Sequence, residues 1–464
     1  MPIKIFNTMG RKNETLKSKK VKMFVCGPTV YDYSHLGHAR TYIAYDIIVK
    51  YLRYKKFDIF YLMNITDIDD KIINRAKEMK VNPLDLSKKF EEDFYDDMES
   101  LGIDSINKFA RASDHIEEII DQVRRLIEKG FAYETQNGIY FDITKFKDYG
   151  KLSHQNLEEL KKHRIEPDPT KRNPQDFALW KKEKSEEISW ESPWGNGRPG
   201  WHIEDTAISE KYLGPQYHIH GGGIDLIFPH HEAEIAQMES VSGKKPMVKI
   251  WTHTEFLRIN GEKMAKSLGN FITIRDALEK DTPETLRLFF AFTHYRSPVD
   301  YNKKNLEKSK KSLESLYETL ENIDHYKKKM RPNAKKKTEW KNILKDTRKK
   351  FEEAMDDDFN TPEALGVLFN LQKKVNKLIE EEKEISIFLA YDIINFFREI
   401  GCILGILKGK KESKIGEEVK KLVKEREDAR KSGNWKKADE IRNKILDMGL
   451  ILEDTTKGPR VKKK

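Results

Sequence analysis

The chain has 464 residues, too many for one hydrophobic core, so about two to four domains are expected. Its two cysteines, Cys26 and Cys402, lie far apart in sequence, which excludes a disulfide framework and fits a reducing cytoplasm. No apolar run approaches the ~18 residues needed to cross a bilayer, and the N-terminus lacks the apolar core of a signal peptide. The formal net charge of +10 is compatible with a polyanionic partner and equally with a lysine-rich surface.

The first third of the chain has an α/β pattern. Residues 21–27 and 57–66 predict strands, and residues 39–56 between them carry apolar residues at mostly helical spacing. A strand, a helix and a second strand within this length indicate a βαβ unit and hence a parallel sheet. Strand patterns return at 216–221 and 248–260, so strands are expected again later in the chain.

An α+β insertion is expected over residues 115–195. Residues 115–130 predict an amphipathic helix that Gly130 ends. After it, the Asn137-Gly138 pair between two apolar runs predicts a hairpin.

From about residue 305 the apolar residues repeat at three- and four-residue steps, which is typical of a helical bundle. One of its helices has a clear start, since Thr361 can cap it and Pro362 fits the first turn. The stretch 393–407 is apolar enough to be a buried helix, and Cys402 within it is expected to be a small buried packing residue.

The stretch "CGPTVYDYSHLGHAR" (26–40) leaves a predicted strand and enters a predicted helix. His35 and His38 flank Gly37 near the helix start, where free N–H groups and the helix dipole favour anions. Two imidazoles there can hydrogen-bond phosphate oxygens, and Gly37 lets a ligand approach the backbone closely. Taken alone, the stretch is also compatible with two surface histidines in a loop.

The stretch "GEKMAKSLGN" (261–270) places two lysines, Lys263 and Lys266, three residues apart before a serine and a glycine. Such a segment suits a mobile loop that grips a polyphosphate, because lysine stabilises charge that spreads over phosphates in a transition state. Taken alone, it is more often a solvated charged loop.

Half of a metal site is indicated by "IHGGGIDLIFPHHEAEIAQ" (219–237). Pro229 is expected to open a helix that carries His230 and Glu234, which are four residues apart and therefore share a face. A histidine and a carboxylate at that spacing are common metal ligands. The spacing alone does not identify the remaining ligands.

The pair "HLGH" and "KMAKS", far apart in an α/β pattern, resembles the HIGH and KMSKS signatures of class I aminoacyl-tRNA synthetases. The surrounding segments narrow the resemblance to a bacterial-type cysteinyl-tRNA synthetase, over essentially the whole chain. They are "FVCGPTVYDYSHLGHAR", "NITDIDDKII", "RPGWHIE", "HGGGIDLIFPHHEAEIAQ", "KMAKSLGNF" and "DDFNTPEAL". The tail "REDARKSGNWKKADEIRNKILDMGLILEDT" is similar to that family's C-terminal anticodon-binding domain.

The resemblance implies an α/β protein with a Rossmann-type parallel-sheet catalytic domain and an α+β insertion. A helical bundle follows, and a polar break then leads into a small C-terminal anticodon-binding domain. The expected boundaries are 1–114 and 196–304 for the two halves of the catalytic domain, 115–195 for the insertion, 305–407 for the bundle and 408–464 for the linker and tail.

The implied reaction has two steps. ATP, accompanied by Mg²⁺, and L-cysteine would form cysteinyl-adenylate, and the cysteinyl group would then pass to tRNA-Cys. The first step is an in-line displacement that needs positioning and charge stabilisation. The resemblance assigns catalysis to His35, His38, Lys263 and Lys266, and ATP binding to Pro28, Gly37, His38, Gly222, Asp225 and Lys266.

Asp225 is implied to contact the adenylate ribose, although a simple capping role would also explain it. Ala265 replaces the middle serine of the KMSKS pattern, which removes one hydroxyl but keeps both lysines. A modest effect on the rate is expected from that replacement.

The resemblance also implies one zinc ion per chain that binds the substrate thiolate. The family uses two cysteines, a histidine and a glutamate, and three of these match Cys26, His230 and Glu234. The second cysteine is replaced by Asp205, which carries the same charge and can also bind zinc, but is a harder ligand. The alternatives are a metal-free polar site, or a rearranged one that uses His202, Glu204 or His231.

The cysteine pocket and the tail carry further implied sites. Thr66, Trp201 and His220 match residues that surround the substrate cysteine, although Trp201 could equally belong to the core. In the tail, Arg430, Trp435, Asp439 and Asp454 match positions that the family uses around the anticodon. Arginine can hydrogen-bond guanine, aspartate can accept from cytosine, and tryptophan can stack on an exposed base. Ordinary helix charge pairs would also explain the charged residues.

Two other functions remain in competition with a cysteine–tRNA ligase. One is an enzyme on the same core that joins cysteine to a small amine, and the tail, residues 419–464, argues against it. The other is a non-catalytic RNA-binding relative, and the intact histidines and lysines of the two signatures argue against it. The family implies a cytoplasmic monomer that does not enter membranes.

Overall fold

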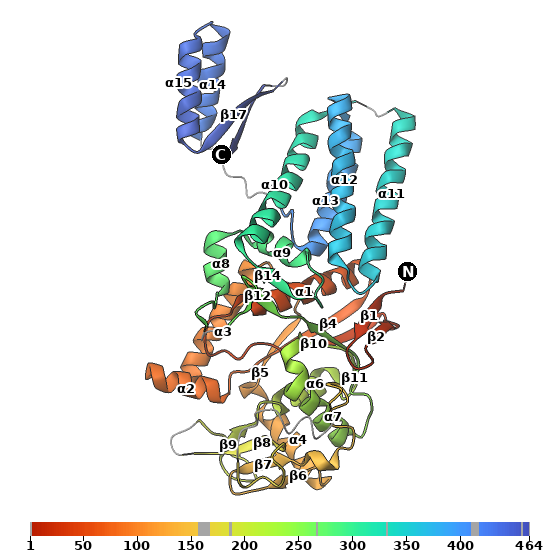
Figure 1. The fold of residues 1–464 in the computed structure, drawn as a ribbon, viewed down its shortest axis with the longest axis vertical. Coiled ribbons are helices and arrows are strands. Elements are labelled where there is room, and N and C mark those ends of the chain that lie inside the picture. Colours follow the sequence, from red (N-terminus) through yellow and green to blue (C-terminus); the bar gives the residue numbers. More distant parts are fainter. Residues whose placement is uncertain are drawn as a thin grey trace. The chain divides into compact units, whose positions relative to one another are not determined.

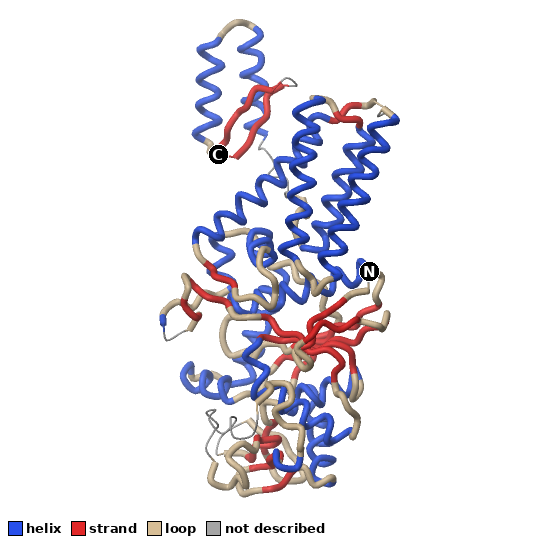
Figure 2. Tube along the Cα trace, turned by 45° about the vertical axis from the view of Figure 1, so that its right-hand side comes forward, coloured by secondary structure: helices blue, strands red, loops and turns tan. Residues whose placement is uncertain are grey.

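The structure, a computed structural model, describes residues 2–155, 168–184, 188–265, 268–330, 333–409, 417–455 and 458–463. The chain forms two compact units, Met1–Ile406 and Leu407–Lys464. The first is built around a five-stranded parallel sheet, shown with its strands side by side in Figures 1 and 2. In sheet order the strands are β11 (Val248–Thr254), β10 (Tyr217–Gly223), β3 (Lys20–Val25), β4 (Asp58–Ile65) and β5 (Lys108–Arg111).

The predicted βαβ unit is confirmed: β3, α1 (Leu36–Tyr54) and β4 follow one another, and the two strands pair in parallel. Helix α1 begins three residues before the predicted start because His35 caps it. The ring of His35 accepts hydrogen bonds from the N–H groups of Gly37 and His38. Burial of the apolar face of α1, which includes Ile43, holds the signature segment rigidly beside the sheet.

The returning strands are also confirmed, with one correction. Residues 216–221 fall in β10, which completes the centre of the sheet. The stretch 248–260 is divided between β11 and β12 (Leu257–Ile259), which belong to different sheets. Strand β12 pairs with β13 (Glu262–Lys263) and β14 (Val299–Tyr301) in a small sheet.

The insertion contains a helix and an antiparallel sheet. Helix α4 (Ile116–Glu128) ends before Gly130, whose φ of +76° suits glycine, and the predicted hairpin joins β6 to β7. The sheet consists of β6 (Ala132–Glu134), β7 (Gly138–Phe141), β8 (Phe177–Lys182) and β9 (Gly197–Pro199). The predicted boundaries of the domains stay predictions.

Two short helices follow the insertion and bring the acidic residues Asp205 and Glu234 close to Cys26, at the end of β3. They are α6 (Ile203–Leu213) and α7 (Glu232–Ser242), and both are largely buried. The prediction that Pro229 opens the second helix was wrong by three residues. Residues Ile227–His231 form a separate turn, within which Phe228 has extended φ and ψ angles, and regular α-helix begins at Glu232.

The predicted helical bundle consists of four long helices: α10 (Lys303–Tyr326), α11 (Ala334–Asp356), α12 (Thr361–Glu382) and α13 (Ile387–Leu404). The predicted cap of α12 was wrong, because Asn360 rather than Thr361 accepts a hydrogen bond from the N–H of Glu363. The apolar stretch 393–407 is largely buried as predicted. However, Cys402 faces solvent instead of packing inside.

The first unit contains further short elements. They are the hairpin β1 (Lys4–Asn7) and β2 (Lys12–Thr15), helices α2 (Asp70–Met79), α3 (Pro83–Ser100), α8 (Ile274–Lys280) and α9 (Pro283–Ala291), and the two-residue strands β15 (Lys327–Lys328) and β16 (Ile385–Ser386).

A buried ion pair joins the signature helix to the end of the bundle. The guanidinium of Arg287 on α9 donates to the carboxylate of Asp46 on α1, and both side chains are almost fully buried. Arg287 also donates to the backbone carbonyls of Leu404, Leu101 and Gly102 at 3.0, 3.1 and 3.3 Å. Removing one partner of such a pair typically costs about 3–5 kcal/mol, so this contact fastens the end of α13 to α1.

The second unit has a small core of its own. Helices α14 (Glu417–Lys431) and α15 (Trp435–Asp447) pack with the hairpin β17 (Leu450–Thr455) and β18 (Gly458–Lys463). Ile441, Ile445 and Leu452 form its buried centre. Among the described residues of the whole chain, no helix has both the length and the apolarity that a membrane crossing requires.

Because each unit has its own core, we expect truncation after Ile406 to leave the first unit folded. The expected change in its midpoint of thermal unfolding is below about 2 °C. Circular dichroism of the truncated and full-length chains measures this. Loss of the cooperative transition in the truncated chain would show that the tail is needed to fold the first unit.

Candidate active site

A group of polar side chains gathers where the parallel strands end. Cys26 directly follows β3, Asn64 and His253 lie near the ends of β4 and β11, and His220 lies midway along β10. The carboxyl ends of parallel strands are the usual location of ligand sites in open α/β sheets. Loops and helices that leave this edge therefore converge on Cys26.

The four residues that the family resemblance implies as metal ligands, Cys26, Asp205, His230 and Glu234, lie together. Asp205 Oδ2 is 3.5 Å from Cys26 Sγ and 2.8 Å from His230 Nε2. Glu234 Oε1 is 3.1 Å from His230 Nε2 and 3.9 Å from Cys26 Sγ. One sulfur, one nitrogen and two oxygens therefore face a common point. They come from Cys26 after β3, His230 in the turn before α7, Asp205 on α6 and Glu234 on α7.

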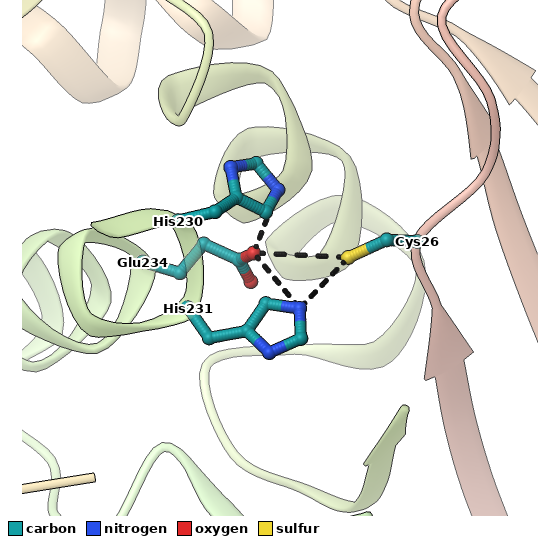
Figure 3. Close-up of side chains that lie close together, drawn as sticks. All are labelled: Cys26, His230, His231 and Glu234. Carbon is teal, nitrogen blue, oxygen red and sulfur yellow. Dashed lines mark hydrogen bonds and ion pairs between the residues drawn. The ribbon is translucent and has the colours of Figure 1, made fainter. Parts of the chain in front are cut away.

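His231 offers a second arrangement. Its Nε2 atom lies 3.1 Å from Cys26 Sγ. One ligand atom from each of Cys26, His230, His231 and Glu234 lies within 4.8 Å of the others, and Figure 3 shows these four side chains converging. Asp205 and His231 thus compete for one position in a four-ligand site.

Neighbouring histidines orient the two candidate imidazoles. His202 Nδ1 lies 2.8 Å from His230 Nδ1, which leaves Nε2 of His230 facing the carboxylates. His253 Nε2 lies 2.8 Å from His231 Nδ1 in the same way. Burial lowers the pKa of His202, His231 and His253, the last to about 3, so these rings are neutral at neutral pH.

The acidic groups of the cluster are strongly destabilised as anions. Burial raises the pKa of Glu234 and of the Cys26 thiol well above their ordinary values, and the nearby carboxylate of Asp205 raises both further. Glu234 Oε2 is buried and accepts no hydrogen bond from a described residue, although His220 Nε2 lies 3.5 Å away. A divalent cation would remove this penalty. Thiolate, imidazole and carboxylate are also the ligand types that zinc accepts, so the residues fit zinc.

Hydrogen bonds from β4 fix Asp205 and the adjacent Glu204. Asn64 donates from Nδ2 to Asp205 Oδ1 at 2.5 Å and accepts at Oδ1 from the N–H of Gly27 at 2.7 Å. The hydroxyl of Thr66 donates to Glu204 Oε1 at 2.5 Å. The buried end of β4 therefore sets the position of the first turn of α6.

The proposed pocket residues border the same cluster. The ring of Trp201 stacks on the ring of His230, with centroids 4.6 Å apart, and 37% of Trp201 is exposed. His220 is fully buried, with Nε2 3.4 Å from Cys26 Sγ and Nδ1 2.7 Å from the hydroxyl of Tyr217. Trp201 is thus half open to an arriving ligand, whereas His220 lies beneath the cluster.

The two signature stretches lie side by side. The N–H of Leu36 donates to Ile272 O at 3.1 Å, and the N–H of Ile274 donates to Ser34 O at 2.9 Å. A Cβ atom on Gly37 would lie 3.5 Å from Met264 Cε. The segment that contains KMAKS is therefore held against the start of α1.

The histidines of "HLGH" form a compact pair. Their rings stack with centroids 3.8 Å apart, and His38 Nδ1 accepts from the N–H of His35 at 3.4 Å. Burial, His35 and Lys71 together lower the pKa of His38 well below its ordinary value. At neutral pH, His38 is therefore a neutral ring that can donate a hydrogen bond to a phosphate oxygen.

The lysine-containing loop is closed at its base. Asn270 donates from Nδ2 to Lys263 O at 3.0 Å and accepts at Oδ1 from the N–H of Ala265 at 2.8 Å. The side chain of Lys263 is exposed, with Nζ 5.1 Å from the centre of the Phe256 ring. Lys266 lies outside the described residues.

The remaining residues predicted to contact the nucleotide, Pro28, Gly222 and Asp225, lie near the ends of β3 and β10. Pro28 is buried, and its carbonyl accepts from the N–H of Thr66 at 3.1 Å. Gly222 is in β10, where its N–H donates a hydrogen bond to the Tyr45 hydroxyl oxygen at 2.9 Å. Asp225 is exposed just beyond that strand. The structure thus groups Gly222 and Asp225 at one strand end.

The predicted anticodon residues form a surface on the second unit. Arg430 and Asp454 form an ion pair at 2.6 Å, and Asp454 also binds both terminal nitrogens of Arg426 at 2.7 Å. Trp435 is 61% exposed, with the Arg430 guanidinium 5.9 Å from its ring centre, and Asp439 is exposed on α15. An exposed indole beside an arginine can stack on a base.

Sequence reasoning missed Asn64 and His253. Asn64 lies in the "NIT" segment, and its place near the end of a buried strand was the one available signal. His253 has a similar signal, since it interrupts an apolar strand near its carboxyl end. Their roles depend on which strands become neighbours, which local periodicity does not give.

Comparisons with known proteins agree with this architecture. Residues 12–311 match the family model of the class I (C) tRNA synthetase catalytic domain, residues 350–408 match the DALR domain, and residues 412–460 match the cysteinyl-tRNA ligase anticodon-binding domain. The cysteine–tRNA ligase of Thermococcus onnurineus is 47% identical over 99% of this chain and 98% of its own. That of Thermococcus kodakarensis is 49% identical over the same shares.

A solved structure shows the same fold. Methionyl-tRNA synthetase of Mycobacterium tuberculosis in complex with methionyl-adenylate superposes with a TM-score of 0.63 and 16% identity, over 84% of this chain and 92% of that one. The matches to the curated relatives, at 47% and 49% identity over 99% of this chain, show the family as well as the fold. The chain therefore belongs to the cysteine–tRNA ligases, a family of class I aminoacyl-tRNA synthetases.

Proposed function

We propose that the chain activates L-cysteine with ATP and Mg²⁺ and transfers it to tRNA-Cys, using a zinc site formed by Cys26, Asp205, His230 and Glu234. The buried cluster of these four side chains is the observation that carries the proposal. Its combination of sulfur, nitrogen and oxygen ligands suits zinc. Bound there, zinc would favour cysteine over serine, because it binds a thiolate far better than a neutral hydroxyl.

Asp205 is preferred to His231 as the fourth ligand for two reasons. Its Oδ2 atom reaches two of the other ligands, at 2.8 Å from His230 Nε2 and 3.5 Å from Cys26 Sγ. His231 Nε2 is nearer to Cys26 Sγ, at 3.1 Å, but lies 3.9 Å from Glu234 Oε1. Asn64 holds the other oxygen of Asp205 and so leaves Oδ2 directed at the cluster. A carboxylate in a buried site also needs a positive partner, which a metal supplies.

Adenylate formation is assigned to the two signature stretches. His35 and His38 would donate hydrogen bonds to phosphate oxygens from the start of α1, and Lys263 and Lys266 would stabilise charge on the leaving pyrophosphate. Pro28, Gly37, Gly222 and Asp225 would complete the ATP site. The backbone contacts between Leu36 and Ile272 support this assignment, because they keep both stretches at one place.

The substrate amino acid would lie between these signatures and the metal site. Trp201, partly exposed above His230, would cover the thiol, while Thr66 and His220 would border the amino and carboxylate groups. The exposed surface of Arg430, Trp435, Asp439 and Asp454 would contact the anticodon. We propose further that the enzyme is a cytoplasmic monomer.

Replacing Asp205 tests the metal site. Asp205→Ala removes one ligand and one charge, so zinc affinity should fall at least about tenfold, or ~1.4 kcal/mol, and cysteine affinity should fall with it. Asp205→Cys should bind zinc at least as tightly as the wild type, because thiolate is the softer ligand. Elemental analysis of protein purified without added metal measures the zinc content.

His231→Asn is the matched control, since it removes the competing imidazole. Full zinc content in this variant and reduced content in Asp205→Ala is the expected pair of results. The reverse pair would assign the fourth position to His231, and an unchanged content in both would place the metal elsewhere.

Replacing Lys266 tests the phosphate loop. Lys266→Ala should slow cysteine-dependent pyrophosphate exchange at least about tenfold, because a charge that stabilises the transition state is lost. Cysteine affinity should change little. Lys280→Ala, on the exposed end of α8, serves as a control with the same loss of charge. Equal exchange rates in the two variants would refute the role of Lys266.

Replacing Trp435 tests the tail. Trp435→Ala should reduce aminoacylation of tRNA about tenfold or more, since the stacking of one base contributes roughly 1–3 kcal/mol. Pyrophosphate exchange should be unchanged because the cysteine and ATP sites lie in the first unit. A parallel loss of exchange and charging would show that Trp435 acts on the fold rather than on the anticodon.

A further inference from the structure

Arg40 is a buried cation in the first signature that the assignments above leave without a role. It lies on α1, two residues after His38, and is 2% exposed. The hydrogen bonds that the structure describes for it all run to backbone carbonyl oxygens. Nε donates to Glu255 O at 3.0 Å, and Nη2 donates to His294 O and Tyr295 O at 3.3 Å and to Ser297 O. Burial lowers the pKa of Arg40 to about 10, which still leaves it protonated at neutral pH.

These carbonyls belong to the two segments that lead into the small sheet of the lysine-containing loop. Glu255 lies two residues before β12, and Ser297 lies two residues before β14. Strand β12 pairs with β14 on one side and with β13 on the other, and the KMAKS stretch begins in β13. The guanidinium of Arg40 therefore binds both of the segments that precede strands of this sheet.

The same helix carries the histidines that face the loop. His38 lies two residues before Arg40 on α1, and His35 caps the start of this helix, which is buried along one face. Met264, in the KMAKS stretch, lies close to the start of α1: its Cε atom would be 3.5 Å from a Cβ atom on Gly37. A shift of the small sheet along α1 would therefore change the distance between the loop lysines and the two histidines.

We propose that Arg40 is a positioning residue for adenylate formation, which fixes the sheet that bears the KMAKS loop at one distance from the histidines of α1. The inference rests on the proposed roles of these two stretches. Arginine suits this task because its planar fork presents several N–H donors in different directions. Lysine keeps the charge but carries its donors on one nitrogen, so it cannot hold both segments in the same geometry.

The segment 294–297 has a second anchor, which makes the role of Arg40 separable from folding. The carboxylate of Asp358 accepts from the hydroxyl of Tyr295 at 2.7 Å and from Nε of Arg296 at 2.6 Å. The backbone of the segment thus remains attached to the bundle when Arg40 is changed. Loss of Arg40 should shift the loop rather than unfold the protein.

The test compares Arg40→Lys with Arg287→Lys. Arg287 is the matched control because it is also buried and also donates to backbone carbonyls. It joins α9 to α13 and pairs with Asp46 on α1, and none of the hydrogen bonds described for it runs to the small sheet of β12, β13 and β14. Four quantities are measured for each variant and the wild type: the thermal midpoint, zinc content, kcat and KM of pyrophosphate exchange, and the single-turnover rate of transfer from preformed cysteinyl-adenylate to tRNA. Rates are taken at a temperature where circular dichroism shows each variant to be folded.

Arg40→Lys should lower kcat of the exchange reaction about tenfold to a hundredfold, as a small misplacement of reacting groups does. Its zinc content, its KM for cysteine and the transfer rate should stay near those of the wild type. Arg287→Lys should lower the thermal midpoint and leave kcat close to the wild-type value.

The inference would be overturned if the two variants lost kcat of exchange in the same proportion to their loss of thermal midpoint. It would also be overturned if Arg40→Lys lowered the exchange rate and the transfer rate equally. If Arg40→Lys does not fold, Arg40→Gln, which keeps one donating amide, replaces it. Failure of both to fold while Arg287→Lys folds would assign Arg40 to the fold alone and overturn the inference. A wild-type chain without cysteine-dependent exchange would instead overturn the proposed function, and this inference with it.

Discussion

Several ionisable groups cannot be buried together as anions unless a positive charge is supplied among them. In this protein the thiol of Cys26 and the carboxylates of Asp205 and Glu234 share one buried volume, and burial keeps the nearby imidazoles of His220 and His231 neutral. Around this constraint the structure places rigid supports: β3 carries the thiol, β4 holds α6 through Asn64, and the turn before α7 delivers His230. A cation in that volume would convert the electrostatic cost into binding energy for the metal.

The parallel sheet explains why residues so distant in sequence can meet there. The five strands are parallel and end at the same edge, so residues on and after β3, β4, β10 and β11 converge there. The second signature reaches this edge differently, through the small sheet and the backbone bonds near Ile272. Its position is therefore set by tertiary contacts, among them the hydrogen bonds of the buried Arg40 to backbone carbonyls.

Local patterns in the sequence were sufficient for much of the fold. The βαβ unit, the hairpin at Asn137-Gly138 and the bundle depend on periodicities and turn residues within single segments, and all three are present. The errors arose where local signals compete: Asn360 and Thr361 can both cap a helix, and an apolar helix does not reveal which of its small residues, such as Cys402, faces outward. The metal ligands followed from resemblance, and the geometry supports but does not test their roles. Asn64 and His253 could not be predicted, because their partners lie on other strands.

The outward orientation of Cys402 makes the two thiols of the chain chemically distinct. Cys26 is buried, and burial also raises the pKa of its thiol, so an alkylating reagent in solvent does not reach it readily, whereas Cys402 is open to solvent on α13. A maleimide dye would therefore label the bundle selectively and leave the candidate metal ligand unmodified. The native sequence thus already contains a single accessible attachment point from which fluorescence could follow motions of the bundle helices.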